Sequence, residues 1–288
     1  MVKISVIILN YNTKELLKQC LLSLHNSLFL IHNSEVIVVD NGSTDGSGEM
    51  VGKEFSKAKL IANPENYGFA RGNNVALKQA QGKYILLLNS DTVVGKNSLP
   101  AMVKFMEENL KVGVATCRVE LSDGKLDPAC HRGFPTPWAS LTYFLGLEKL
   151  FPKSKLFAQY HQTFKDLNTV HEIGSPTGAF YLVRREAVDR VGMLDEDYFM
   201  YGEDLDWSYR IKEAGWKIMY LPTVEIIHLK RQSGRENISE VERRKATDYF
   251  YQAMKLFYQK YYQNKYQFFV NWLMILGINL KWRLARIK

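Results

Sequence analysis

The segment that decides the fold is VKISVIIL, residues 2–9, which is followed at once by Asn10-Tyr11-Asn12. A continuous apolar run rich in β-branched residues is typical of a strand buried on both faces of a parallel sheet. The polar triplet marks the carboxyl end of that strand, which is the edge where open α/β sheets bind ligands. The first dozen residues therefore predict an α/β fold and the beginning of a binding site.

Strands and helices alternate through the first 120 residues. Strands are predicted at 35–39, 59–62, 84–88 and 113–120, and helices at 13–28, 68–80 and 98–109. This alternation is typical of a doubly wound, mostly parallel sheet. After it, residues 122–168 contain four of the eight prolines, and we interpret them as a variable, partly helical excursion. A loop leading into a strand is expected at 172–183, and two short strands at 217–221 and 224–227.

Length and composition indicate an ordinary globular protein. The chain has 288 residues, 46% of them hydrophobic and 24% charged, which is enough to bury a sizeable core. Its net charge of +8 favours acidic partners such as nucleotides, anionic lipids or nucleic acid. Most of the surplus positive charge lies in the tail. From Ala246 onward the sequence contains seven Lys or Arg residues and a single acidic residue, Asp248.

The chain shows no signal for export or membrane spanning. The apolar start is too short for a signal peptide, and the apolar run 268–280 is shorter than the roughly 20 residues that a spanning helix requires. The three cysteines Cys20, Cys117 and Cys130 indicate neither a disulfide framework nor a metal site. We therefore expect a cytoplasmic protein, either free or peripheral at the inner face of the plasma membrane.

The segment DEDYFMYGEDLDWSYR, residues 195–210, concentrates six carboxylates and five aromatic side chains. Glu203, Asp204 and Asp206 fall where a helix is expected to begin, because Trp207 and later apolar residues follow helical spacing. Acidic residues in a first helical turn can simply offset the helix dipole. Three acids in four positions exceed that need, and an aromatic surrounding raises a carboxyl pKa toward the value of a general base.

Polar residues after the predicted strands suggest a nucleotide site. Asp40-Asn41-Gly42-Ser43 has neither the spacing of a dinucleotide fingerprint nor the lysine of a P-loop, and a capped turn would explain it equally well. At the end of a strand next to Tyr11, however, Asp40 is suited to accept the N3–H of a pyrimidine base. Arg71 and Asn74, at the start of a helix, are candidates to meet a diphosphate.

Asp91 and His228 are candidates for a metal site. Asp91 follows Asn89 and Ser90 at a strand end, and its oxygen neighbours suit a hard divalent cation, although strand ends often carry Asp for turn formation alone. His228 ends the last predicted strand, where a structural histidine and a metal ligand are equally compatible with the sequence.

Six motifs together resemble one family. They are Asn10-Tyr11-Asn12, residues 40–45 (DNGSTD), residues 66–74 (NYGFARGNN), residues 88–92 (LNSDT), Gly178-Ala179 and residues 201–210 (YGEDLDWSYR). In this order they resemble the family 2 glycosyltransferases of GT-A fold, especially the rhamnosyltransferase-like branch, over about Val2 to Ser233. The resemblance implies one GT-A domain at 1–235, with a nucleotide-sugar half at 1–120 and an acceptor half at 121–235, followed by a C-terminal helical extension at 236–288.

The resemblance also implies roles for residues. Asp204 would be the base of an inverting displacement, with Glu203 orienting the acceptor and Gly178, Trp207 and Arg210 shaping its pocket. The nucleotide sugar would be bound by Asn10, Tyr11, Asn12, Asp40, Asn41, Ser43, Arg71, Asn74, Asn89, Ser90 and Asp91. Asp91 and His228 would hold Mg²⁺ or Mn²⁺. The usual Asp-x-Asp of the family is Asn89-Ser90-Asp91 here, so we expect a weaker metal site.

The expected substrates are dTDP-rhamnose, or alternatively a UDP-sugar, and a glycan or lipid-linked acceptor of bacterial surface polysaccharide synthesis. A nucleotidyltransferase is the alternative enzyme, but residues 10–14 lack its glycine-rich loop with Arg and Lys. Nucleic acid is not an expected partner, because the cations gather in an aromatic tail instead of on a known binding module. That tail is equally compatible with core packing, a homodimer, or binding to an anionic membrane surface.

Overall fold

The computed structural model describes residues 2–28, 31–229 and 239–287. The first half contains β1 (Ile4–Asn10), α1 (Lys14–Leu28), β2 (Ser34–Asp40), α2 (Ser47–Glu54), β3 (Lys59–Ala62), α3 (Phe69–Leu77) and β4 (Tyr84–Asn89). All the strands and helices that the sequence predicts here are confirmed. The short helix α2 was not predicted, since its sequence SGEMVGKE contains two glycines, which disfavour helix.

The second half contains β5 (Thr92–Val94), α4 (Ser98–Glu108), β6 (Val112–Leu121), the 3-10 helix η1 (Pro128–Cys130), α5 (Pro137–Phe144), α6 (Leu147–Leu150), β7 (His171–Glu172), β8 (Phe180–Arg184), α7 (Arg185–Val191), α8 (Glu203–Glu213) and β9 (Lys217–His228). The predicted strands at 217–221 and 224–227 are one strand, which corrects the prediction. Its pairing with β6 shifts between Leu221 and Glu225, so that Pro222 sits in an irregularity and does not end the strand.

One mixed sheet joins both halves, in the order β3-β2-β1-β4-β8-β6-β9-β5, with β7 added against β9. The pairs β3-β2, β2-β1, β1-β4 and β6-β9 are parallel, whereas β8 is antiparallel to both of its neighbours. In the register of β1 and β2, Asn10 lies opposite Asp40. The carboxyl ends of these strands therefore meet at one edge, as expected for a ligand-binding edge.

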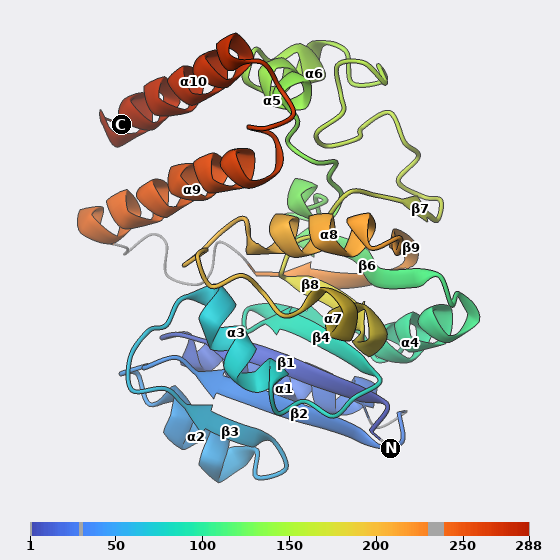
Figure 1. The fold of residues 1–288 in the computed structure, drawn as a ribbon. Helices are drawn as coiled ribbons and strands as arrows, with labels where there is room; N and C mark the ends of the chain where they lie inside the picture. Colours follow the sequence, from blue (N-terminus) through green and yellow to red (C-terminus); the bar gives the residue numbers. More distant parts are fainter. Residues whose placement is uncertain (1, 29–30, 230–238, 288) are drawn as a thin grey trace.

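Helices cover both faces of the sheet and close the core. Figure 1 shows α3, α7 and α8 in front of the sheet and α1 behind it. The buried core combines the aliphatic residues of β1, β2 and β4 with those of β6 and β8. The predicted α/β fold is confirmed, and because the core is continuous from β1 to β9, the two halves of the sheet form a single framework.

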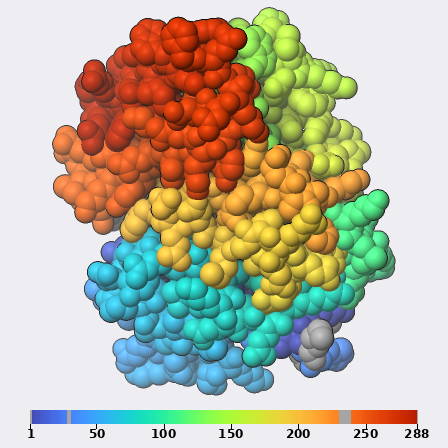
Figure 2. All heavy atoms as spheres, viewed as in Figure 1, coloured from blue at the N-terminus to red at the C-terminus, as the bar shows by residue number. Residues whose placement is uncertain are grey.

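Two C-terminal helices, α9 (Glu240–Tyr261) and α10 (Phe268–Ile287), follow, and α10 packs on α9. Helix α9 contacts the acidic segment, since the Tyr261 hydroxyl donates a hydrogen bond to Asp206 at 2.6 Å and Lys260 contacts Asp195. Figure 2 shows the C-terminal part of the chain, in red, against the gold surface of residues before α8. The predicted domain boundary between 235 and 236 lies outside the described residues. No helix in the described part of the chain is long and apolar enough to cross a membrane.

Candidate active site

The carboxyl ends of β1 and β2 are held together by Asn10. Its side chain is fully buried and donates hydrogen bonds to Ser43 at 3.2 Å and, more weakly, to Asp40 at 3.4 Å. The amide oxygen of Asn10 accepts a hydrogen bond from Thr13 at 2.7 Å. Asn10 therefore fixes the loop that carries Asp40, and its own polar atoms are engaged inside the protein.

Asn12 and Ser43 shape the same loop. Asn12 adopts a left-handed backbone conformation with φ 53°, in which its side chain accepts a hydrogen bond from the Thr44 amide at 2.8 Å. The Asn12 amide in turn donates to the Ser43 hydroxyl at 3.0 Å. Tyr11 lies between Asn10 and Asn12 in the sequence. Its side chain is 46% exposed and remains available for stacking against a planar ligand.

Asn41, a predicted nucleotide ligand, is buried and engaged inside the protein. Its amide donates to Asn66 and to the carbonyl of Gly68, and its amide oxygen accepts from Asn63 and the amide of Tyr67. These four hydrogen bonds use the polar capacity of the side chain. Asn41 therefore fastens the approach to α3, and its contact with a nucleotide stays a prediction.

Arg71 and Asn74, both on α3, have different surroundings. The Arg71 guanidinium is exposed and stacks on the ring of Tyr67 at 4.0 Å, so its donors are oriented but accessible. Asn74 is buried and exchanges hydrogen bonds with the backbone of Leu194, and it also donates to Glu196. The Asn74 amide therefore anchors the start of the acidic segment, and its contact with a nucleotide stays a prediction.

Asp91 and His228 do come together at the end of β4. His228 Nε2 lies 3.1 Å from Asp91 Oδ1, and the Asn89 side-chain amide lies 3.4 Å from the same nitrogen. Ser90 is buried and shares a hydrogen bond with Thr13 at 2.9 Å. The antiparallel pairing of β5 with β9 sets His228 opposite Thr92 and thereby next to Asp91.

A second carboxylate, Asp127, contacts the other ring nitrogen of His228 and orients the ring. Its Oδ2 lies 3.2 Å from His228 Nδ1, and both side chains are buried. Burial lowers the pKa of His228, but hydrogen bonds and charges from Asp127 and Asp91 outweigh it and raise the pKa above its ordinary value. A carboxylate on one ring nitrogen directs the other nitrogen toward a metal ion in many metal sites.

Asp91 and His228 can hold a divalent cation only if further ligands complete its coordination. An Asp oxygen and an imidazole nitrogen suit Mn²⁺, and the oxygen also suits Mg²⁺. Among the described residues, no group of three or more His, Cys, Asp or Glu side chains could hold a metal ion. Asp91 and His228 therefore fit a cation that takes its remaining ligands from water or from the phosphates of a substrate.

Asp204 lies in the first turn of α8 and is held on both carboxylate oxygens. Its Oδ2 accepts hydrogen bonds from Arg132 Nη2 at 2.8 Å and from the amide of Gly178 at 3.2 Å. Its Oδ1 accepts from the Leu205 amide at 2.7 Å. Burial alone lowers the pKa of Arg132, but the carboxylate of Asp204 reverses this effect and raises it. Arg132 and Asp204 therefore form a nearly buried ion pair.

The carboxyl group of Glu203, the adjacent residue, has a different environment from that of Asp204. Its side chain is buried, and its Oε2 has no hydrogen-bond partner among the described residues. Burial, followed by the charge of Asp204, raises the pKa of Glu203 to about 8. Tyr201, two residues before Glu203, has a backbone φ of 68°. Non-glycine residues rarely adopt this conformation outside constrained sites. Glu203 therefore keeps its proton at a higher pH than an ordinary glutamate does.

Trp207 and Arg210, which were predicted to shape the acceptor pocket, both make contacts inside the protein. Trp207 is fully buried, stacks on Tyr181 and donates to the carbonyl of Gly192 at 2.9 Å. Arg210 donates to Asp206 and to the carbonyls of residues 191 and 193. Both side chains face the body of the protein, because α8 buries this side against α7.

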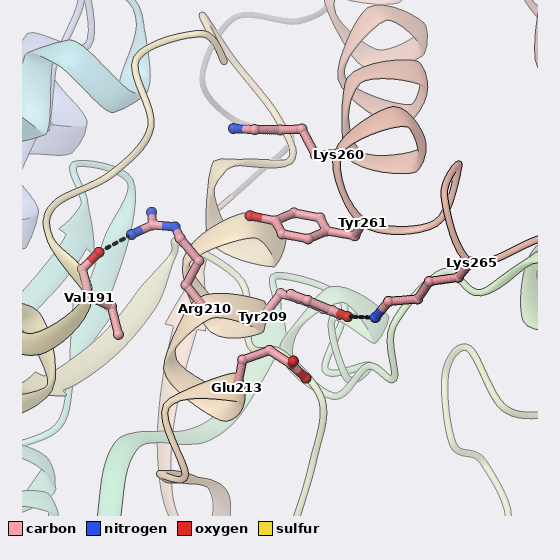
Figure 3. Close-up of a pocket in the computed structure, with 7 residues that line it drawn as sticks. All are labelled: Val191, Tyr209, Arg210, Glu213, Lys260, Tyr261 and Lys265. Carbon is pink, nitrogen blue, oxygen red and sulfur yellow. Dashed lines mark hydrogen bonds between the residues drawn. The ribbon is translucent and has the colours of Figure 1, made fainter.

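A cavity of about 450 Å³ lies between α8 and the end of α9 (Figure 3). Two of its polar groups are engaged within the protein, as Lys265 donates to the Tyr209 hydroxyl at 2.6 Å and Arg210 donates to the carbonyl of Val191. Asp91, His228 and Asp204 do not line it, and we therefore do not assign it to the reaction.

Two residues of the site, Asp127 and Arg132, were missed by the sequence analysis. Both fall at the start of the excursion 122–168, which has no helical or strand periodicity. The structure brings this short stretch across the sheet, so that Asp127 reaches His228 and Arg132 reaches Asp204. Other charged residues, such as Asp123 and Lys125, lie in the same segment, so no local signal distinguished these two.

Comparison with known proteins identifies the family. The model of the family described as Glycosyl transferase family 2 matches residues 5–192. The chain belongs to this glycosyltransferase family. Within it, the chain is 26% identical over 230 residues to an N-acetylglucosaminyl-diphospho-decaprenol L-rhamnosyltransferase of Mycobacterium tuberculosis, covering 76% of this chain and 74% of that one. It is 29% identical over 186 residues to the rhamnosyltransferase WbbL of Escherichia coli, covering 62% and 66%.

Solved structures agree on the fold of this family 2 glycosyltransferase. Staphylococcus aureus TarS superposes with a TM-score of 0.58 at 22% identity, covering 88% of this chain and 39% of that one. The mannosyltransferase PcManGT from Pyrobaculum calidifontis, solved with GDP-Man and Mn²⁺, gives 0.59 at 19% identity, covering 87% and 62%. The predicted GT-A fold and the rhamnosyltransferase-like relationship are therefore confirmed.

Proposed function

We propose that this glycosyltransferase transfers a sugar from a nucleotide-diphosphate donor to an acceptor hydroxyl, with inversion at the anomeric carbon. The observation that carries the proposal is the position of Asp204, a carboxylate that Arg132 and the Gly178 amide hold in the first turn of α8. A general base must be unprotonated at the working pH, and Glu203 is less suited to this role because its pKa is raised to about 8.

In this reaction Asp204 accepts the proton of the acceptor hydroxyl as its oxygen attacks the anomeric carbon. The new bond forms between that oxygen and the anomeric carbon, while the bond from this carbon to the diphosphate oxygen breaks. The nucleoside diphosphate leaves on the opposite face, so a single displacement inverts the configuration. Glu203, protonated near neutral pH, can donate a hydrogen bond to the acceptor without competing as a base.

The donor would lie against the carboxyl ends of β1, β2 and β4. Asp40 would accept the N3–H of a thymine or uracil base, with Tyr11 stacking near it and Arg71 available for the phosphates. Asp91 and His228 would hold Mg²⁺ or Mn²⁺, which when bound supplies positive charge next to the leaving diphosphate. Asp127 would keep the His228 ring turned toward that position.

We propose dTDP-rhamnose as the first donor to test, supported by the names of the mycobacterial and Escherichia coli relatives. A UDP-sugar is the alternative, supported by the structure of TarS in complex with UDP-GlcNAc. For the acceptor we propose a glycan or a lipid-linked sugar of a bacterial surface polysaccharide. The name of the mycobacterial relative, which includes a diphospho-decaprenol acceptor, supports the lipid-linked form.

A thermal-shift panel of nucleotide sugars, each with and without Mn²⁺, tests the donor. A ligand that binds only the folded state raises the melting temperature, and at equal concentration a tighter ligand raises it more. We expect the largest shift from dTDP-rhamnose with Mn²⁺, followed by assays for release of the nucleoside diphosphate. Release of pyrophosphate instead would indicate a nucleotidyltransferase and would contradict the proposal.

A further inference from the structure

The outer face of α10 is apolar along its whole length. Its exposed side chains recur every three or four residues: Phe269, Leu273, Leu276, Leu280, Leu284 and Ile287. This spacing places them on one stripe of the helix. Leu273 and Leu280 are 57% and 56% exposed, so the stripe faces away from the protein.

The inner face of α10 already has a partner. Met274, Ile275 and Ile278 pack toward α9, and Trp282 donates to Asp248 at 2.7 Å. The helix therefore presents apolar residues on both sides, whereas an ordinary surface helix is polar on its outer side. Packing within the chain accounts for the inner side only, and an apolar stripe of this length indicates an interaction surface.

A second group of exposed apolar residues adjoins α10. Helices α5 and α6, with the turns that follow them, expose Trp138, Leu141, Leu145, Leu150 and Phe151. The two groups are neighbours, because Lys281 of α10 lies 5.3 Å from the ring of Phe144 in α5. Figure 1 shows α5, α6 and α10 together at the end of the molecule away from α2 and β3. We call these two groups together the apolar end.

The charges around the apolar end have one sign. Helix α10 contains Lys281, Arg283 and Arg286 and no acidic residue. Residues 137–159 contain Lys149, Lys153 and Lys155, and their single acid, Glu148, is buried against His161. Arg286 is paired with Asp248. The remaining cations stand beside exposed leucine and tryptophan side chains, a combination that suits a surface both apolar and anionic.

We propose that the apolar end docks on the surface of an anionic lipid bilayer. A second copy of the chain is a poorer occupant, because a two-fold interface would bring Lys281 and Arg283 toward the same cations of its partner. In a bilayer, α10 would lie in the interfacial plane, with its leucines in the acyl boundary and its cations among the headgroups. This inference goes beyond glycosyl transfer and does not depend on which sugar is transferred.

Flotation of the full chain with vesicles tests the proposal. We expect binding to vesicles of phosphatidylcholine mixed with phosphatidylglycerol, much less binding to phosphatidylcholine alone, and weakening by added salt. Replacing Lys281 and Arg283 by Gln removes two cations, each contributing about 1 kcal/mol near such a surface, which corresponds to a loss of roughly 30-fold in partitioning. Equal binding to both vesicle types would contradict the proposal that the bilayer must be anionic.

The apolar part is tested by Leu273→Glu with Leu280→Glu, which we expect to abolish flotation. The matched control is Leu22→Glu with Leu110→Glu, the same change at leucines that are 53% and 70% exposed on other parts of the protein. Circular dichroism and donor binding should be unchanged in both variants, which separates loss of docking from loss of folding or function. Flotation of the α10 variant at the wild-type level would overturn the proposal. So would a concentration-dependent dimer that this variant alone disrupts, because the occupant would then be a second copy.

Discussion

Arg132 donates a hydrogen bond to Asp204 at 2.8 Å, and this contact joins the loop after β6 to the first turn of α8. Arg132 also donates to the carbonyl of Pro176, next to the segment that supplies the Gly178 amide. Five residues earlier in the chain, Asp127 contacts His228 beside Asp91. One short stretch therefore supports both the proposed base and the proposed metal ligands, which lie at different strand ends.

Asp204→Asn should retain donor binding and lose transfer. The amide is nearly isosteric but cannot accept the proton of the acceptor, and a positioned general base typically contributes about 10²–10⁴-fold to the rate. Calorimetry of donor binding and a rate assay measure the two effects separately. The control is Asp197→Asn, an exposed acid of the same segment, which should behave as wild type. Near-normal turnover of Asp204→Asn would mean that another group is the base.

Arg132→Gln should lower the rate of transfer and the stability of the fold. The guanidinium contacts Asp204 at 2.8 Å, and without it the proposed base is no longer fixed in the first turn of α8. Breaking a buried ion pair costs about 3 kcal/mol or more in folding free energy, which denaturant unfolding would report. Arg132→Lys, which retains the charge, should restore part of both losses. A wild-type transfer rate in Arg132→Gln would contradict the positioning role.

Glu203→Gln should flatten the dependence of stability on pH. The pKa of Glu203 is raised to about 8 in the folded protein, above its unfolded value, so the native state binds its proton more tightly. Its contribution to stability is fully present below the unfolded pKa of about 4.3 and is lost as pH rises toward 8. Comparison of unfolding curves at several pH values across this window checks the difference. A variant whose stability declines with pH as steeply as the wild type would argue against a protonated Glu203.

Asp91→Ala should weaken donor binding in the presence of Mn²⁺ and have a smaller effect without it. The substitution removes the carboxylate that faces His228, leaving one protein ligand for the cation. Isothermal titration with dTDP and UDP, each with Mn²⁺ and with chelator, gives the comparison. Asp189→Ala, an exposed acid on α7, serves as the control. Unchanged nucleotide affinity with Mn²⁺ would remove Asp91 from the metal site.

Asn41→Ala should lower the stability of the fold and have little effect on donor binding. The amide satisfies two backbone groups and two side chains inside the protein, and a buried polar group left without a partner costs about 1–3 kcal/mol. A lowered melting temperature with near-normal donor affinity, measured below the transition, is the expected result. A large loss of affinity in a protein of wild-type stability would assign Asn41 to the nucleotide site.

The sequence by itself determined most of the alternating strands and helices of the first half and the position of the ligand-binding edge. These features follow from local patterns, since apolar runs define buried strands and parallel strands bring their carboxyl ends to one edge. Only the tertiary structure decided which polar residues are free to act. Asn41, Asn74, Trp207 and Arg210 carry suitable chemistry, yet their atoms are engaged by backbone and side chains distant in sequence. The tertiary structure also revealed Asp127 and Arg132, because contacts across more than 70 residues leave no periodic signal in the chain.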